Sequence, residues 1–268
     1  MHTIRDKDLF LLDMDGTIYH ENTLIPGTKE FFSLLVKQGK YYCFLTNNSS
    51  KGRASYVEKL LKLGIDVTEK NIVSSVSVTV SYLNQIKRHA KIYLVGTASL
   101  KRELENEGFV IVSSSYRKSD VDFVLVGFDT ELNYSKIDGA CYYISRNCKY
   151  LATNCDLRCP IIDNKYIPDC GAICKMIECA TNRTPIYLGK PNREIVDYAS
   201  NLWNVPLSKI ICIGDRLYTD IAVGINAGIS TAVVFTGETT PDDLKNSMFK
   251  PEFCFNSIAD IYEILNNN

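Results

Sequence analysis

The sequence predicts an α/β protein with a largely parallel sheet, into which a second α/β domain is inserted. Short apolar runs alternate with helix-length segments along the chain of 268 residues, which is typical of parallel-sheet folds. Runs near both ends of the chain stop in charged or amide side chains, whereas no run in the middle ends in a pair of acids. We therefore expect residues 1–79 and 185–268 to form one domain and residues 80–184 to form the insertion.

The elements of the first domain follow from apolar runs of strand length and from the helix-length segments between them. In chain order we expect strand 10–12, helix 29–38, strand 41–45, helix 53–63, strand 186–188, helix 194–203, strand 210–213, helix 222–227 and strand 231–235. In the insertion the same criteria predict strands 92–95, 110–112, 123–126 and 150–152, and helices 100–107 and 135–146.

Composition limits the function. The hydrophobic fraction of 46% is ordinary for a globular protein, and the net charge of -1 gives no long-range attraction to a nucleic acid polymer or an anionic membrane. No apolar run approaches the roughly 20 residues of a membrane span, and residues 1–8 lack the apolar core of a signal peptide. We expect a cytoplasmic protein, and the composition leaves its oligomeric state open.

The chain contains ten cysteines, and without an export signal we expect them to be reduced. Cys155 with Cys159 and Cys170 with Cys174 suggest a zinc site as an alternative. Their spacing is not that of a zinc ribbon and no histidine stands near them, so small buried side chains are the preferred interpretation.

The strand at 10–12 runs directly into Asp13 and Asp15, which an ideal strand would place on the same face. Two carboxylates this close repel each other unless a cation lies between them or one is protonated. This arrangement suits a divalent metal and a carboxylate nucleophile beside a general acid/base, and Gly16 then permits a sharp turn. The residues alone do not decide which aspartate is the nucleophile.

Three further strands are followed by residues of complementary chemistry. The second leads to Thr46 and Asn47, the strand at 186–188 to Lys190, and the strand at 210–213 to Asp215, with Asp220 shortly after. Ligands of open α/β sheets bind at the carboxyl ends of the strands. Carboxylates, a cation and small donors together predict a magnesium-assisted phosphoryl-transfer site.

Each motif has an alternative interpretation. Asp13 to Gly16 also resembles the start of an EF-hand loop, but the twelfth position is Leu24 and not glutamate. Lys190 could lie on a surface turn; it is followed by Pro191 and not by Ser or Thr, which disfavours a P-loop kinase. No G-x-G-x-x-G follows a strand, which disfavours a dinucleotide-binding dehydrogenase. The ordered combination at four strand ends favours the phosphoryl-transfer site.

These residues resemble the four motifs of the haloacid dehalogenase (HAD) superfamily. The segments 45–49, 152–156, 189–191 and 214–221 resemble, more finely, the NagD-like, 4-nitrophenylphosphatase branch with a C2-type cap. The resemblance implies a Rossmann-like parallel-sheet core in residues 1–79 and 185–268 and a C2-type cap in residues 80–184. It departs from the usual pattern at residues 169–172. The implied activity is hydrolysis of a small phosphorylated metabolite, and a phosphotransferase or phosphomutase remains the alternative.

The resemblance also implies roles for the motif residues. Asp13 is the nucleophile that forms an aspartyl-phosphate, and Asp15 is the acid/base. Mg²⁺ is bound by Asp13, by the backbone carbonyl of Asp15 and by Asp215. The phosphate is held by Lys190 together with two residues after the second strand, Thr46 and Asn47. Asp220 orients Lys190 or a water on the metal.

In the cap, the resemblance implies that the loop at 154–160 reaches the leaving group, with Asp156, Arg158 and Cys159 as the contacts. Phe128 is a further candidate that would pack on the substrate. The alternative, that Asp156 caps a turn and Phe128 is a core residue, stays open. A regulatory protein with an inactive phosphatase fold is disfavoured because the core motif residues are all present.

Overall fold

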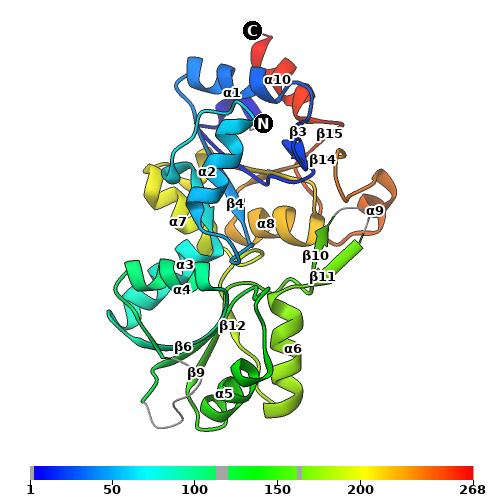
Figure 1. Ribbon diagram of the computed structural model, residues 1–268. Coiled ribbons are helices and arrows are strands. Elements are labelled where there is room, and N and C mark those ends of the chain that lie inside the picture. The colour runs from blue at the N-terminus through cyan, green and yellow to red at the C-terminus, as the bar shows by residue number, and fades with distance from the viewer. Residues whose placement is uncertain (1–2, 113–119, 162–164, 268) are drawn as a thin grey trace. The chain divides into compact units, whose positions relative to one another are not determined.

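The computed structural model describes residues 3–112, 120–161 and 165–267. The chain divides into two compact units, which are described separately (Figure 1). The first unit comprises Met1–Thr46, Arg53–Val73 and Lys190–Asn268; the second comprises Asn47–Gly52 and Ser74–Gly189.

The first unit contains a six-stranded sheet in the order β15-β14-β13-β1-β4-β5. Strand β1 pairs in parallel with β13 and β4, and β14 pairs in parallel with β13 and β15. The bounds of the strands are β1 Leu9–Leu12, β4 Tyr41–Thr46, β5 Ile72–Ser74, β13 Ile210–Gly214, β14 Ser230–Val234 and β15 Phe253–Phe255. A short antiparallel hairpin, β2 Tyr19–His20 with β3 Thr23–Leu24, follows β1.

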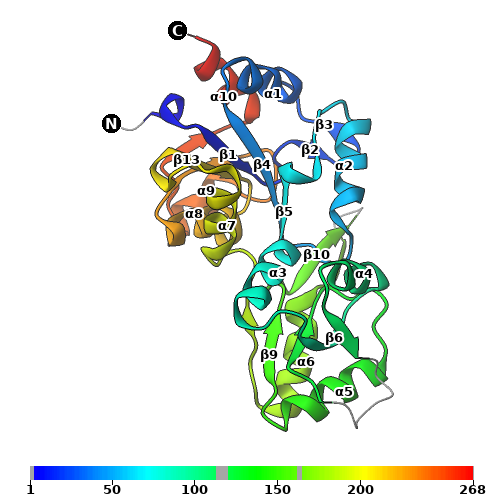
Figure 2. The ribbon, with the colours of Figure 1, turned by 90° about the vertical axis from the view of Figure 1, so that its left-hand side faces the viewer.

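Helices pack on this sheet as adjoining pairs, α1 with α10 and α7 with α8 (Figure 2). Phe10 and Leu12 of β1 belong to a cluster with apolar side chains of α1, α2 and α10, whereas Leu9 and Leu11 alternate to the other face. Both faces of β1 are therefore buried, as expected of a central parallel strand. The helices are α1 Thr28–Lys37, α2 Arg53–Lys62, α7 Glu194–Trp203, α8 Ala222–Ala227, α9 Pro241–Asn246 and α10 Ile258–Asn266.

The second unit has its own five-stranded sheet, in the order β12-β9-β8-β6-β7, in which every pair is parallel. Apolar clusters lie on its two faces, one containing residues of α5 and α6 and the other residues of α3 and α4. The elements are α3 Ser75–Ile86, β6 Lys91–Val95, α4 Ala98–Asn106, β7 Val110–Val112, β8 Phe123–Val126, α5 Tyr134–Ile144, β9 Lys149–Ala152, α6 Cys170–Thr181 and β12 Ile186–Tyr187. The antiparallel hairpin of β10 Arg158–Ile161 and β11 Lys165–Pro168 precedes α6.

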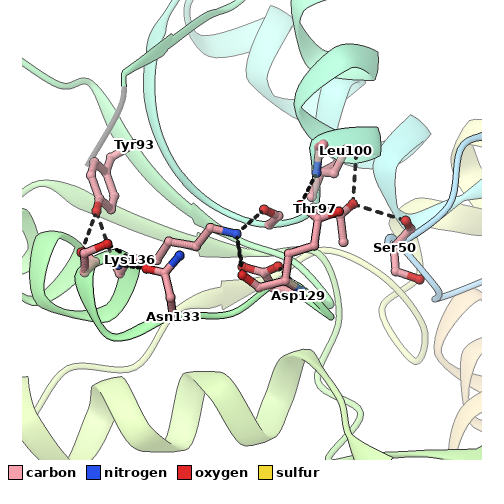
Figure 3. Close-up of polar contacts among 11 residues, drawn as sticks. Ser50, Tyr93, Thr97, Leu100, Asp129, Asn133 and Lys136 are labelled. Carbon is pink, nitrogen blue, oxygen red and sulfur yellow. Dashed lines mark hydrogen bonds and ion pairs between the residues drawn. The ribbon is translucent and has the colours of Figure 1, made fainter. Parts of the chain in front are cut away.

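Polar contacts join the loops at the carboxyl ends of β6 and β8. Lys136 Nζ lies 2.8 Å from Asp129 Oδ2 and donates to the Gly96 carbonyl at 2.9 Å (Figure 3). Thr97 caps α4, and its hydroxyl also donates to the carbonyl of Ser50 at 3.1 Å. The segment Asn47–Gly52 is thus hydrogen-bonded into the second unit.

The structure confirms the α/β class, and every helix and strand expected from the sequence is present with its bounds shifted by at most a few residues. The assignment of the strand near residue 186 to the first sheet was wrong, because β12 pairs with β9 in the second unit. The inserted stretch begins at Ser74 and not at residue 80, since Ser74 caps α3 and that helix packs in the second unit. It ends at Gly189 and not at residue 184, and the unit also includes Asn47–Gly52. The alternating Ser/Val pattern of α3 has no helical period, which is why the sequence did not reveal it.

All ten cysteines are free, as expected. Four of them are buried, namely Cys43, Cys170, Cys174 and Cys212, but Cys179 and Cys254 are exposed, so burial does not account for every one. Within the described parts of the chain, the helices are too short or too polar for any of them to cross a membrane.

Candidate active site

The candidate site lies at the carboxyl ends of β1 and β13. Leu12 pairs with Ile213, and the backbone N–H of Asp13 donates to the Ile213 carbonyl at 2.9 Å. Because the two strands are parallel neighbours, Asp13 and Asp215 emerge at the same edge of the sheet. One carboxylate oxygen from each of Asp13, Asp215 and Asp220 lies within 4.8 Å of the others, and all three residues are buried.

Lys190 supplies the positive charge among these carboxylates. Its ammonium group is 2.7 Å from Asp13 Oδ1 and 2.7 Å from Asp220 Oδ1, and it donates to the Leu45 carbonyl at 3.3 Å. Only 3% of the residue is exposed. Burial by itself lowers the pKa of Lys190, but the two carboxylates outweigh burial and raise that pKa above its ordinary value. Lys190 is therefore held as a buried cation.

A π-helical turn, η4 Leu217–Ile221, brings Asp220 back over the end of β13. A Cβ atom at Gly214 would lie 2.3 Å from Asp220 Cβ, so this close approach requires glycine. Asp220 Oδ1 contacts Lys190, and Oδ2 accepts a hydrogen bond from the Arg216 N–H at 3.1 Å. Both oxygens of Asp220 already have partners, which makes Asp220 a poorer metal ligand than Asp13 or Asp215.

Asp215 is held from one side only. Its Oδ2 accepts the backbone N–H of Glu238 at 2.7 Å, whereas its Oδ1 is buried without a hydrogen-bond partner among the described residues. A Cβ atom at Gly16 would lie 2.6 Å from Oδ2, and one at Gly237 would lie 2.0 Å from it. Two backbone segments can therefore close around this carboxylate only because neither has a side chain there.

The donor set fits a hard divalent cation. Burial raises the pKa of Asp215, and the negative charges of Asp13 and Asp220 raise it further. A buried oxygen without a partner is costly, and a cation beside Asp13 and Asp215 would satisfy Asp215 Oδ1. Carboxylate oxygens are ligands of the kind that Mg²⁺ prefers.

Asp15 differs from Asp13. Strand β1 ends at Leu12, so the expected strand alternation does not govern the two aspartates: Asp13 is buried, whereas Asp15 is exposed. The carboxylate of Asp15 is not among the three clustered ones. Desolvation by the surrounding protein raises the pKa of Asp15. The positive charge of Lys59 opposes this increase, and the negative charge of Asp13 adds to it. That Asp15 supplies a backbone carbonyl to a metal stays a prediction.

The remaining candidate residues divide between the units. Thr46 is buried at the end of β4, beside β1, whereas Asn47 is the first residue of the second unit's segment Asn47–Gly52. In the second unit, Asp156 accepts a hydrogen bond from Asn47 Nδ2 at 3.0 Å. The guanidinium of Arg158 lies 4.4 Å from the centroid of the Tyr166 ring.

Cys159 in β10 is partly exposed, which leaves its expected contact with a leaving group untested. Phe128 is only 3% exposed and belongs to the apolar cluster of α5 and α6, which agrees with the alternative that it is a core residue.

The sequence interpretation missed two sets of contacts. Gly237 and Glu238, which close around Asp215, follow the last strong strand β14, so the strand-end criterion could have indicated them. Ser75 and Asn154 both donate to the Asn47 carbonyl at 2.8 Å. No local signal predicts that contact, because the partners are far apart in the sequence.

Comparison with known proteins places the chain in a family. A model described as haloacid dehalogenase-like hydrolase matches residues 10–110, and one described as HAD-hydrolase-like matches residues 187–261. Ribonucleotide monophosphatase NagD of Escherichia coli (strain K12) is 31% identical, with 94% of this chain and 96% of that protein covered. Glycerol-3-phosphate phosphatase of Homo sapiens is 32% identical, with 98% and 92% covered.

A solved structure agrees with these relatives. The crystal structure of 4-nitrophenylphosphatase from Thermotoga maritima superposes with a TM-score of 0.94 at 38% sequence identity, covering 99% of this chain and 100% of that one. The two matched segments contain the residues of the candidate site. Asp13 lies in the first, and Lys190, Asp215 and Asp220 lie in the second. The chain therefore belongs to the haloacid dehalogenase-like hydrolases, and within them it is a NagD-like phosphoric monoester hydrolase.

Proposed function

We propose that this protein is a magnesium-dependent phosphatase that hydrolyses a small phosphorylated metabolite through an aspartyl-phosphate at Asp13. The observation that carries the proposal is the buried group of Asp13, Asp215 and Lys190. In it, one oxygen of Asp215 has no partner among the residues that the structure describes, and the lysine contacts Asp13. Carboxylates that repel one another in a buried site are costly, and such an arrangement persists where the chemistry needs it.

In the proposed reaction, a carboxylate oxygen of Asp13 attacks phosphorus, and the bond from phosphorus to the leaving oxygen breaks. Asp15 donates a proton to that oxygen, so that an alcohol departs. Asp15 then accepts a proton from a water molecule, whose oxygen attacks phosphorus and releases inorganic phosphate and free Asp13. The exposure of Asp15 supports this role, because its proton must be exchanged with the leaving group and with water.

The metal is proposed to bind Asp13, Asp215 and the backbone carbonyl of Asp15. When bound, Mg²⁺ supplies positive charge that offsets the repulsion between Asp13 and the phosphate oxygens. Lys190 contributes a second positive charge at Asp13, and Asp220 orients the lysine through its contact at 2.7 Å. The glycines around Asp215 Oδ2 support this assignment, since they leave Oδ1 as the oxygen that needs a partner.

Thr46, Asn47 and Lys190 are proposed to hold the phosphate oxygens. A hydroxyl, an amide and an ammonium group are suitable donors for them. We also propose that the first unit acts as the catalytic core and the second as the cap. Arg158 and Cys159, which lie at the accessible β10–β11 hairpin, then contact the leaving group.

The substrate class rests on the relatives. Their names describe phosphatases of ribonucleotide monophosphates, glycerol-3-phosphate and 4-nitrophenyl phosphate, which share a phosphomonoester and differ in the leaving group. A small phosphorylated metabolite is the substrate class common to the two metabolic enzymes. A phosphotransferase would use the same Asp13 and pass the phosphoryl group to an alcohol other than water.

The test is a phosphate-release assay over a panel of nucleoside monophosphates, sugar phosphates, glycerol phosphate and 4-nitrophenyl phosphate. We expect release with Mg²⁺ and none with EDTA. A parallel assay with a sugar acceptor separates hydrolysis from phosphoryl transfer, since transfer would form a new phosphate ester in place of inorganic phosphate. Full activity in metal-free buffer, or no release from any member of the panel, would overturn the proposal.

A further inference from the structure

The segment Asn47–Gly52 belongs to the second unit, although the residues on both sides of it, Thr46 and Arg53, belong to the first. Its first residue, Asn47, is buried, and the second unit holds both its backbone and its side chain. The Asn47 carbonyl accepts hydrogen bonds from Ser75 Oγ and from Asn154 Nδ2, each at 2.8 Å. Its Nδ2 donates to Asp156 Oδ2 at 3.0 Å.

The space on the other side of the Asn47 amide is equally restricted. A Cβ atom at Gly189 would lie 2.5 Å from Asn47 Oδ1 and 2.7 Å from the Thr153 carbonyl, so glycine is required for this packing. The amide of Asn47 is therefore fixed between the Gly189 backbone and the Asp156 carboxylate. Hydrogen bonds and steric contact both determine its orientation.

Asp156 is itself well placed to act as a fixed partner. Its backbone N–H donates to Asn154 Oδ1 at 2.9 Å, and its carbonyl accepts the Gly171 N–H at 2.8 Å. Gly171 lies in the first turn of α6, where a Cβ atom would come within 2.3 Å of the Cys155 carbonyl. The loop that carries Asp156 is thus anchored at both of its backbone groups.

The chemistry of the pair decides its geometry. An ionised carboxylate only accepts hydrogen bonds, so the Asn47 amide must direct its nitrogen, and not its oxygen, towards Asp156. Bonds to a charged acceptor are stronger than those between neutral groups. The nitrogen has two hydrogens, and the bond to Asp156 uses one of them.

We propose that Asp156 is a positioning residue that acts through Asn47, setting the affinity of the site for the phosphate group and not the choice of leaving group. The inference rests on the proposed function, in which Asn47 holds a phosphate oxygen. It replaces the expectation that Asp156 contacts the leaving group, because the carboxylate faces Asn47. The loop at 154–160 then has two separate tasks, with Asp156 supporting phosphate binding and Arg158 facing solvent on the hairpin.

Inorganic phosphate separates the two roles, because it has no leaving group. We expect Asp156→Ala to weaken phosphate binding about tenfold in calorimetry with Mg²⁺ present, as one oriented hydrogen bond is lost. In turnover, kcat/KM should fall by a similar factor for every substrate of the panel. Arg158→Ala is the matched control on the same loop and should leave the dissociation constant of phosphate unchanged.

Two further variants test the path through Asn47. In a double-mutant cycle, Asn47→Ala and Asp156→Ala should not be additive, because removing Asn47 first leaves Asp156 nothing to orient. Asp156→Asn retains an oxygen acceptor and should recover most of the phosphate affinity. This conservative variant also guards against a folding defect in Asp156→Ala, which the unfolding midpoint of each variant will reveal.

The outcomes distinguish this inference from the proposed function. An unchanged phosphate affinity in Asp156→Ala, additive losses, or a loss confined to particular leaving groups would overturn the positioning role while leaving the phosphatase intact. Phosphate binding without hydrolysis of any ester would overturn the proposed function, and the calorimetric comparison would still decide the inference. A wild-type protein that binds no phosphate would overturn both.

Discussion

The two units bury polar groups at the carboxyl ends of their sheets in opposite ways. In the first unit, three carboxylates cluster, two of them (Asp13 and Asp220) share one lysine, and Asp215 Oδ1 has no hydrogen-bond partner among the described residues. In the second, Ser49 Oγ lies 2.9 Å from Thr153 Oγ1 and accepts the Phe128 N–H, so that neutral groups satisfy one another. The buried carboxylate of Asp129 is paired with Lys136 at 2.8 Å.

The arrangement in the first unit lowers the stability of the fold, whereas the arrangement in the second unit raises it. Unbalanced buried charge is destabilising, whereas a satisfied network of hydroxyls and amides rigidifies the segments it joins. The first arrangement is suited to binding a cation and an anion. The second is suited to fixing Asn47–Gly52 and the loops around it.

The largest effect is expected for Asp13→Asn. This variant removes the proposed nucleophile, so phosphate release should fall by at least about a thousandfold. It also removes one of three clustered negative charges, and the metal-free protein should unfold at an unchanged or higher temperature. Near-normal turnover would contradict the assignment of Asp13, and a strongly lowered unfolding temperature would contradict the charge-repulsion account.

Replacing the lysine should have the largest effect on stability. Lys190→Met leaves Asp13 and Asp220 without their shared cation, and removing one partner of a buried ion pair costs about 3–5 kcal/mol. The free energy of unfolding in urea should fall by that amount in metal-free buffer. Lys136→Met, which removes the partner of the buried Asp129 in the second unit, is the comparison variant. It leaves the candidate site untouched, so phosphate release should persist. A Lys190→Met protein as stable as wild type would show that the carboxylates are protonated and need no cation.

The position of Asp215, a proposed metal ligand, should depend on the glycine backbone that packs against its carboxylate. In Gly237→Ala the new Cβ atom would lie 2.0 Å from Asp215 Oδ2, so the carboxylate must move. We expect the affinity for Mg²⁺, measured by calorimetry, to fall about tenfold, with part of the activity restored at high Mg²⁺. Glu238→Ala is the control, because it keeps the backbone N–H that Asp215 accepts, and should lose much less affinity. Equal losses in both variants would contradict the explanation that the close approach of the Gly237 backbone sets the position of Asp215.

The smallest effect concerns the neutral network. Ser49→Ala leaves the Phe128 N–H and the Thr153 hydroxyl without this partner, and the expected loss is about 1–3 kcal/mol of unfolding free energy. Magnesium affinity should not change, since Ser49 touches no proposed metal ligand. A change in Mg²⁺ affinity as large as that of Gly237→Ala would break the distinction between the two regions.

The sequence by itself determined the elements and the motif residues. The runs before Asp13 and Asp215 are strands, and helices α7 and α8 begin and end where the sequence predicted. Gly228, which follows α8, has a φ of +71°, and such an ending is readable from the sequence because glycine adopts that conformation without steric cost. These features depend on residues adjacent in the chain.

Tertiary structure decided which residues meet. Lys190 follows a strand of the second sheet, yet its ammonium group contacts Asp13, 177 residues away in the chain. Asp156 turned out to face Asn47, 109 residues away, and Phe128 to lie in an apolar cluster. A strand end specifies which chemical group is presented, but sheet order and the packing of side chains determine its partner, and neither is encoded by local spacing.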